Sequence, residues 1–275
     1  MVIFCWIMSA ITTALVSVYG GLVSTWNEVW IAILLLVAFF FAWNVVCVVF
    51  AFLVTLPISF KKPVEKPSKF YAWLFNFVNG WIIDMAGVDV VITGWEKIDP
   101  NQSYLFVSNH RSKFDPQIAA RVFKKFKFLA ITKPENLKVP IAGKCIYAAG
   151  FLPIDRENNR KAIETILKAA NYIKKGYSIH LCPEGTRNKN GLDLLPFKNG
   201  GFKAAQRAKA PIAIISLVNT EKIHKNFPFK RTRVHFDIVD VLSADQVVAM
   251  STQEIGDHAM KVIQDKIDEY KAQSK

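Results

Sequence analysis

Residues 108–115, Ser-Asn-His-Arg-Ser-Lys-Phe-Asp, place a histidine and an aspartate five positions apart. A carboxylate within hydrogen-bonding distance of His110 would fix the tautomer of the imidazole. It would also stabilise the imidazolium that forms when the ring takes a proton from a hydroxyl. On a regular helix, residues five apart point about 140° away from each other, so His110 and Asp115 can meet only across a turn. Alone, the pair has a plainer interpretation, a loop histidine beside a helix cap.

The flanking sequence predicts such a turn. Residues 104–107 are apolar and indicate a buried strand. Asp115, followed by Pro116, is typical of the cap and first turn of a helix. The base and the carboxylate that orients it would therefore lie where a strand ends and a helix begins.

Three further motifs follow in order. They are Gly-Phe-Leu-Pro-Ile-Asp-Arg at 150–156, Pro-Glu-Gly-Thr-Arg at 183–187 and Ala-Pro-Ile at 210–212. With the Asn-His and Asp of the first stretch, this series closely resembles the glycerolipid acyltransferase family, specifically the 1-acyl-sn-glycerol-3-phosphate acyltransferases (lysophosphatidate acyltransferases). The resemblance covers residues 88–242, and the order of the motifs makes it specific although each motif alone is modest.

The resemblance implies a role for each motif. His110 would be the general base and Asp115 the carboxylate that orients it. Planar guanidinium groups bind phosphate oxygens bidentately, which suits two arginines to the phosphate of the acceptor. The positions that match acceptor-binding residues of the family are Arg156, Glu184, Gly185, Thr186 and Arg187. An alternative for the two arginines is an ion pair with the neighbouring Asp155 or Glu184.

Other positions also have two interpretations. Glu184 is better suited to orient an arginine or a hydroxyl than to contact phosphate, whereas Gly185 would let the backbone approach the acceptor closely. Lys133 follows an expected strand and is a further candidate phosphate contact, with a solvated surface lysine as the equal alternative. Cys182 and Ser112 are expected to be structural, because Cys182 ends a buried strand and Ser112 shapes the turn.

The mechanism implied by the resemblance is direct transfer. His110 would remove the proton of the free sn-2 hydroxyl, and the oxygen would attack the thioester of acyl-CoA or of acyl carrier protein. Backbone amides would hold the oxyanion, and the thiol would leave. No covalent acyl-enzyme, metal ion or cofactor is expected.

Two departures from the family pattern bear on the acyl chain. Ile214 stands where a second proline is often found in the fourth motif, and Leu181-Cys182 replaces a more usual aromatic approach to Pro183. Glycerol-3-phosphate and other lysophospholipids remain alternative acceptors. The non-enzymatic alternative is a membrane-anchored lipid-binding scaffold without activity, which the intact motif residues argue against.

The charge is unevenly distributed along the 275 residues. The net charge is +13, yet residues 1–60 contain one charged side chain, Glu28, and all 35 Lys and Arg lie beyond it. Residues 1–23 and 29–60 are long enough to cross a bilayer, since about 20 residues suffice. The turn at 24–28 lacks Lys and Arg, whereas four lysines follow at 61–69, so the positive-inside rule predicts that both ends of this hairpin are cytoplasmic.

These patterns divide the chain into three parts: a transmembrane helical hairpin at 1–60, a basic linker with interfacial aromatic helices at 61–87, and an α/β acyltransferase domain at 88–275. The aromatics of 70–86 would lie at the headgroup level, pack under the domain, or do both. We therefore expect a protein of the cell membrane with its catalytic domain on the cytoplasmic side. Its partners would be lysophosphatidate, an acyl thioester, anionic membrane lipid and possibly acyl carrier protein, and not nucleic acid.

From residue 88 the sequence alternates between strand and helix patterns, which predicts a three-layer α/β fold. Strands are expected at 88–94, 104–108, 128–132, 177–182, 212–217 and 234–241, and helices at 117–125, 159–174, 201–208 and 252–272. Four cysteines without a disulfide or metal spacing favour a reducing compartment. No Gly-x-Ser-x-Gly elbow or nucleotide-binding P-loop is found.

Overall fold

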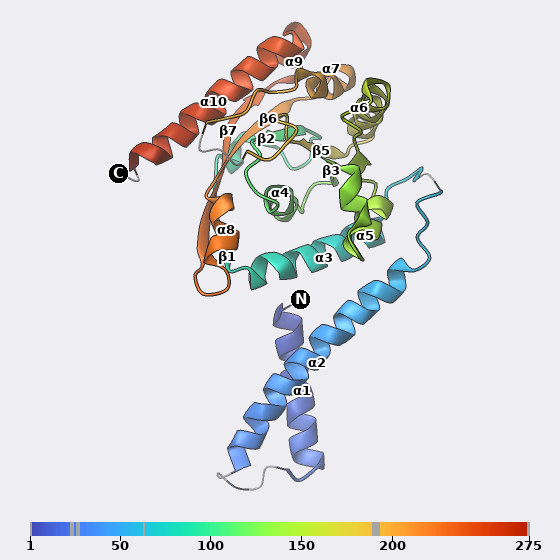
Figure 1. Ribbon diagram of the computed structural model, residues 1–275, viewed down its shortest axis with the longest axis vertical. Helices are drawn as coiled ribbons and strands as arrows, with labels where there is room; N and C mark the ends of the chain where they lie inside the picture. The colour runs from blue at the N-terminus through green and yellow to red at the C-terminus, as the bar shows by residue number, and fades with distance from the viewer. Residues whose placement is uncertain (1, 23–24, 26–27, 63, 189–192, 274–275) are drawn as a thin grey trace.

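The computed structural model describes residues 2–22, 25, 28–62, 64–188 and 193–273. Two apolar helices, α1 (Val2–Tyr19) and α2 (Val29–Thr55), pack side by side and project from the α/β body (Figure 1). Both are long and apolar enough to cross a membrane, and the most apolar window of α2 has no buried residue. The core helix of a soluble protein would be buried, so this exposure favours a lipid environment. Most of the expected turn at 24–28 lies outside the described residues.

The hairpin is joined to the body by α3 (Lys69–Met85), a single helix capped by Ser68. One face of α3 packs inward: Leu74 is buried, and the hydroxyl of Tyr71 donates a hydrogen bond of 2.9 Å to the carbonyl of Val54 in α2. Phe70 and Trp73 are exposed on the other side. The aromatic segment therefore packs under the domain and also presents rings outward, so neither interpretation excludes the other.

A mixed seven-stranded sheet forms the centre of the body, in the order β1-β7-β6-β2-β5-β3-β4. The strands are β1 (Val88–Thr93), β2 (Leu105–Ser108), β3 (Phe128–Thr132), β4 (Leu152–Pro153), β5 (Ser178–Leu181), β6 (Ile212–Val218) and β7 (Thr232–Leu242). β6, β2, β5, β3 and β4 are parallel, whereas β7 is antiparallel to β6 and parallel to β1. The carboxyl ends of five strands consequently meet at one edge.

Helices cover both faces of the sheet, which confirms the three-layer α/β fold. α6, α7, α9 and α10 lie on one face, and α3, α4 and α5 lie on the other (Figure 1). Their bounds are α4 (Asp115–Val122), α5 (Ala142–Ala148), α6 (Asn159–Lys174), α7 (Lys203–Ala208), α8 (Ile223–Asn226), α9 (Ala244–Ala249) and α10 (Thr252–Gln273). A continuous apolar core, including Phe106, Phe123 and Phe236, fills the space between the layers.

The start of α4 differs from the prediction. The helix begins at Asp115 rather than at 117, and Phe114 is its N-cap residue. The Asp115 carboxylate does not cap α4, because it accepts hydrogen bonds from backbone amides of the preceding turn. The short elements α5, α8, α9 and β4 were not predicted.

Candidate active site

The predicted site residues lie on loops at the shared edge of the sheet. His110 follows the end of β2, Lys133 follows β3, Arg156 follows β4 and Glu184 follows β5. Because these strands are parallel, the four loops emerge on the same side. The topology thus brings three separate motifs to one place.

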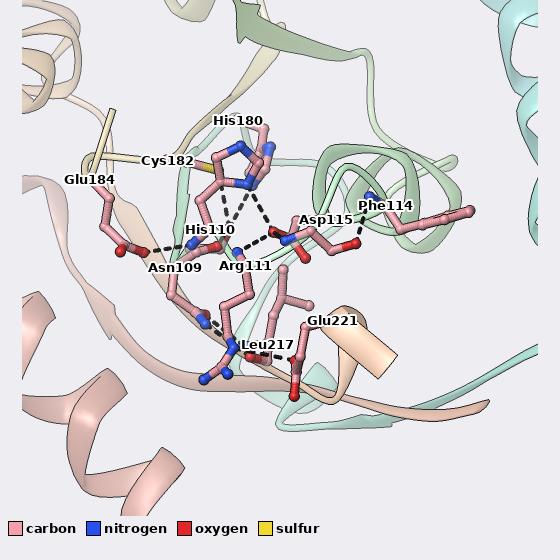
Figure 2. Close-up of polar contacts among 12 residues, drawn as sticks. Asn109, His110, Arg111, Phe114, Asp115, His180, Cys182, Glu184, Leu217 and Glu221 are labelled. Atoms are coloured by element: carbon pink, nitrogen blue, oxygen red, sulfur yellow. Dashed lines mark hydrogen bonds and ion pairs between the residues drawn. The ribbon is translucent and has the colours of Figure 1, made fainter. Parts of the chain in front are cut away.

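His110 and Asp115 are in direct contact across the turn between β2 and α4. The His110 Nδ1 and the Asp115 Oδ2 are 2.8 Å apart (Figure 2). The same carboxylate oxygen accepts hydrogen bonds from the backbone amides of Arg111, at 2.6 Å, and Ser112, at 2.7 Å. The Asp115 side chain is fully buried, and these three donors all bind Oδ2, whereas Oδ1 has no hydrogen-bond partner within the described residues.

This contact defines the state of the imidazole. When Nδ1 donates its proton to the carboxylate, Nε2 carries the lone pair. Among the residues that the structure describes, none forms a hydrogen bond to Nε2 of His110. The His110 side chain is 16% exposed, so the free nitrogen is accessible from the sheet edge. The arrangement can take a proton from a hydroxyl brought to that edge.

Glu184 supports the backbone of this turn. Its Oε1 accepts a hydrogen bond of 2.6 Å from the His110 amide, and its Oε2 accepts one of 3.1 Å from the Leu195 amide. The amide of Asn188 in turn donates to the His110 carbonyl at 2.7 Å. Burial raises the pKa of the Glu184 carboxyl, and the two amides act in the opposite direction. Both carboxylate oxygens thus bind main chain, which favours a positioning role over orienting an arginine or a hydroxyl.

Two more contacts join the turn to the end of β6. The side-chain amide of Asn109 donates to the Leu217 carbonyl at 2.9 Å and accepts from the Leu217 amide at 2.8 Å. The Arg111 guanidinium lies 3.2 Å from the Glu221 carboxylate (Figure 2). Neither partner in β6 or beyond was singled out in the sequence, because only the fold shows that β2 and β6 are neighbours.

Ser108, His180 and Cys182 form a buried polar cluster next to the turn that carries His110. The Ser108 hydroxyl is 2.9 Å from Nε2 of His180, and the Cys182 Sγ is 3.6 Å from the same hydroxyl. Burial, followed by the charge of His110, lowers the pKa of His180 to about 4, so this imidazole is neutral. Burial raises the pKa of the Cys182 thiol far above its usual range. Cys182 is therefore a structural thiol rather than a nucleophile.

The two motif arginines are half-buried. Within the described residues, neither Arg156 nor Arg187 forms an ion pair, and Asp155 instead accepts hydrogen bonds from the amides of Glu157 and Asn158. Burial lowers the pKa of Arg156, against the opposing effect of nearby Cys182 and Glu135, yet a guanidinium remains protonated. The guanidinium groups are thus available to an anionic ligand.

The remaining predicted residues lie around this core without a hydrogen bond to His110 or Asp115 in the described part of the chain. Lys133 and Thr186 are exposed, and Gly185 is buried with a φ of 70°. That φ favours glycine and turns the backbone after Glu184. Across the described ranges, no group of three or more histidine, cysteine or carboxylate side chains is arranged to hold a metal ion.

Comparisons with known proteins point to one family. Residues 89–218 match the sequence profile of the family described as acyltransferase. The 1-acyl-sn-glycerol-3-phosphate acyltransferase of Saccharomyces cerevisiae is 31% identical over 192 residues, which cover 68% of this chain and 61% of that protein. The protein of the same name from Escherichia coli is 29% identical over 202 residues, covering 71% of this chain and 79% of its own length.

A third relative of that name, from Borreliella burgdorferi, is 30% identical over 168 residues, covering 59% of this chain and 66% of its own length. The match thus spans less than two thirds of the yeast and Borreliella relatives. The fold is similar to that of the crystal structure of the 1-acyl-sn-glycerophosphate (LPA) acyltransferase PlsC from Thermotoga maritima. The TM-score is 0.58 and the sequence identity 22%, with coverage of 73% of this chain and 82% of that one.

Proposed function

Because residues 89–218 form a domain of the acyltransferase family, we propose that the protein transfers a fatty acyl group from an acyl thioester to the sn-2 hydroxyl of lysophosphatidate, which yields phosphatidate. The observation that carries this proposal is the 2.8 Å contact between His110 and the buried Asp115 at the sheet edge. This contact provides a base with a defined free nitrogen, at the same sheet edge as two guanidinium groups that form no ion pair within the described residues.

The proposed chemistry proceeds without a covalent enzyme intermediate. The His110 Nε2 takes the proton of the acceptor hydroxyl as its oxygen forms a bond to the thioester carbonyl carbon. The tetrahedral adduct collapses, the carbon–sulfur bond breaks, and the sulfur receives the proton from His110. A base in this position contributes about 10² to 10⁴ in rate. Asp115 keeps its hydrogen bond to Nδ1 and stabilises the imidazolium.

The phosphate of the acceptor would be bound by Arg156 and Arg187, with Lys133 and the exposed Thr186 at the rim. The backbone amides of residues 110, 111 and 112 are already bound to Glu184 or Asp115. The donors that stabilise the oxyanion must therefore come from other groups. The hydrogen bonds of the turn are the reason for excluding these three amides as oxyanion donors.

The hairpin α1–α2 suggests membrane association, and we propose that it is integral, with the catalytic domain on the cytoplasmic side. Such an anchor favours an acceptor that already resides in the bilayer over water-soluble glycerol-3-phosphate. Acyl-CoA and acyl carrier protein are both acceptable donors, because the proposal requires only a thioester. Membrane lipid, with anionic headgroups near the lysines at 61–69, is the expected surrounding.

The test is acyl transfer by the purified full chain in detergent, with acyl-CoA and acyl carrier protein offered separately and lysophosphatidate as acceptor. We expect His110→Ala to lower the rate of phosphatidate formation by about 10² to 10⁴. A matched control is His258→Ala, because His258 also contacts a carboxylate, that of Asp240, at 2.6 Å in the α10–β7 region. This control should keep wild-type activity.

A panel of acceptors distinguishes the alternatives. Activity with glycerol-3-phosphate or another lysophospholipid, and none with lysophosphatidate, would reassign the acceptor while retaining the chemistry. Absence of transfer to any acceptor from either donor, by folded protein, would contradict the enzymatic proposal and favour a lipid-binding scaffold.

A further inference from the structure

An exposed aromatic loop lies outside the machinery described above. Residues 224–231, called the aromatic loop below, comprise the last three residues of α8 and the connection from α8 to β7, with the sequence His-Lys-Asn-Phe-Pro-Phe-Lys-Arg. Phe229 is 96% exposed and Phe227 is 50% exposed. Phe229 is almost wholly outside the packed core and Phe227 is half outside it, so the two rings form a local exposed apolar surface.

Cations flank these rings. Lys225, Lys230 and Arg231 are exposed, and in the described part of the chain none of them forms an ion pair. The acidic side chains nearby are engaged elsewhere: Glu221 binds Arg111, and Asp89 lies 3.5 Å from Arg233. The aromatic loop therefore combines exposed rings with uncompensated positive charge.

The aromatic loop lies at the carboxyl end of α3. The Thr232 amide donates a hydrogen bond of 2.9 Å to the carbonyl of Gly87, just after α3, and Arg231 packs against the same glycine. The other end of α3 leads back to α2, and Tyr71 near that end bonds to Val54. In Figure 1 the aromatic loop hangs below the sheet, on the side from which the hairpin projects.

We propose that the aromatic loop is a second membrane attachment, which inserts Phe227 and Phe229 into the interfacial region of an anionic bilayer. Aromatic rings favour the headgroup level, and each basic residue near the surface is attracted to anionic lipid. The continuity with α2 and α3 favours a lipid surface over a second copy of the chain. This inference rests on membrane association of the hairpin and does not depend on which acceptor is acylated.

The attachment has a structural consequence. α3 has 17 residues and is about 25 Å long. The hairpin fixes its beginning to the membrane, and the aromatic loop fixes its end. Two contacts at this separation hold α3 along the bilayer surface, whereas a hairpin alone would leave the body free to tilt. The catalytic edge is thereby kept in one orientation relative to lipid.

The test places an environment-sensitive fluorescent amino acid at position 229 of the full chain, reconstituted in phosphatidylglycerol–phosphatidylcholine vesicles. Lipids that carry a doxyl quencher near the headgroup report contact. The matched control carries the same fluorophore at Val248, which is 52% exposed in α9 on the opposite side of the body. We expect strong quenching at 229 and little at 248.

Equal quenching at both positions would overturn the proposal. So would a signal at 229 that depends on the protein-to-lipid ratio and not on the quencher, since that result identifies a second copy as the occupant. Replacing phosphatidylglycerol with phosphatidylcholine should weaken the quenching at 229, as should the double variant Lys225→Gln/Lys230→Gln. Because the readout is independent of acyl transfer, its failure is distinguishable from failure of the proposed activity.

Discussion

The Nδ1 of His110 lies 2.8 Å from an Asp115 oxygen that also accepts two backbone hydrogen bonds from the turn between them. One buried carboxylate therefore orients the imidazole and holds the turn that carries it. Substitutions at the two positions should separate the proposed catalytic role of His110 from the structural role of Asp115.

We expect His110→Ala to lower kcat by about 10² to 10⁴ and to lower the thermal unfolding midpoint less than Asp115→Asn does, because the Asp115 carboxylate keeps its two backbone donors. Asp115→Asn should lower kcat as well, because an amide nitrogen facing Nδ1 selects the wrong tautomer. It should also reduce stability by about 1 to 3 kcal/mol, because a buried set of donors loses its charged acceptor. Initial rates and unfolding in the same detergent test both. Equal stability of the two variants would contradict the double role of Asp115.

Glu184→Gln distinguishes a positioning residue from an acceptor-binding one. A glutamine retains one acceptor oxygen, but its NH₂ group faces the amide of either His110 or Leu195, so one buried donor is left unpaired. We expect kcat to fall while the KM for lysophosphatidate stays close to the wild-type value. A rise in KM with kcat retained would return Glu184 to the acceptor-binding group.

The contact between His110 and Asp115 could be predicted from the sequence, whereas the contacts between the turn and distant strands could not. His110 and Asp115 are joined by one turn, whose strand and helix signals flank them. The side chain of Asn109, by contrast, bonds to Leu217, 108 positions away. That contact depends on β2 and β6 being neighbours, which no local pattern specifies.

The same distinction applies to the fold. β3 and α6 were predicted with the bounds that the structure shows, because β3 is an apolar run between Lys127 and Lys133 and α6 is a sixteen-residue amphipathic run that ends before Gly176. β4 has two residues and α5 has seven, which is too short for a period to emerge. β4 forms through a tertiary contact, the pairing of Leu152 with Ile131 in β3.

The arginines should act on acceptor binding. Arg156→Lys and Arg187→Lys each retain the charge but lose the bidentate fork, so we expect kcat/KM for lysophosphatidate to fall by about 10- to 100-fold, mostly through KM. The KM for the acyl donor should not change. Lys133→Ala, at an exposed position, provides the comparison and should have a smaller effect. Loss of kcat at constant acceptor KM in both arginine variants would place them elsewhere in the mechanism.

Asn109→Ala should disturb the site through the fold. It removes both hydrogen bonds to Leu217 and leaves a buried amide and carbonyl unpaired, at a cost of about 2 to 4 kcal/mol. We expect a lower unfolding midpoint together with a lower kcat, because the residue adjoins His110. Asn79→Ala is the matched control: Asn79 is also buried, and it bonds to the carbonyl of Gln117 in α4 rather than to a residue adjoining His110. It should lose stability and retain kcat, and equal kcat losses would argue against a positioning role for Asn109.

His180 should make the stability of the protein depend on pH. Its pKa is about 4 in the folded state, because of burial and the charge of His110, whereas an unfolded histidine titrates near 6.5. As the pH falls below about 6.5, the unfolded chain binds a proton that the folded chain does not. The contribution of His180 to the free energy of unfolding is therefore fully present above about pH 6.5. It is lost as the pH falls toward 4, by a total of about 3 kcal/mol.

The raised pKa of the Glu184 carboxyl has the opposite effect on stability, because the folded chain then binds a proton more readily than the unfolded chain as the pH falls. The contribution of His180 must therefore be measured against a variant that lacks this histidine. His180→Gln can keep a hydrogen bond to Ser108 and has no proton to gain. We expect the unfolding midpoint of the wild type to decline more steeply than that of His180→Gln between pH 7 and pH 4.5 in one detergent. Parallel curves would show that His180 is protonated in the folded state, against the neutral imidazole that its burial requires.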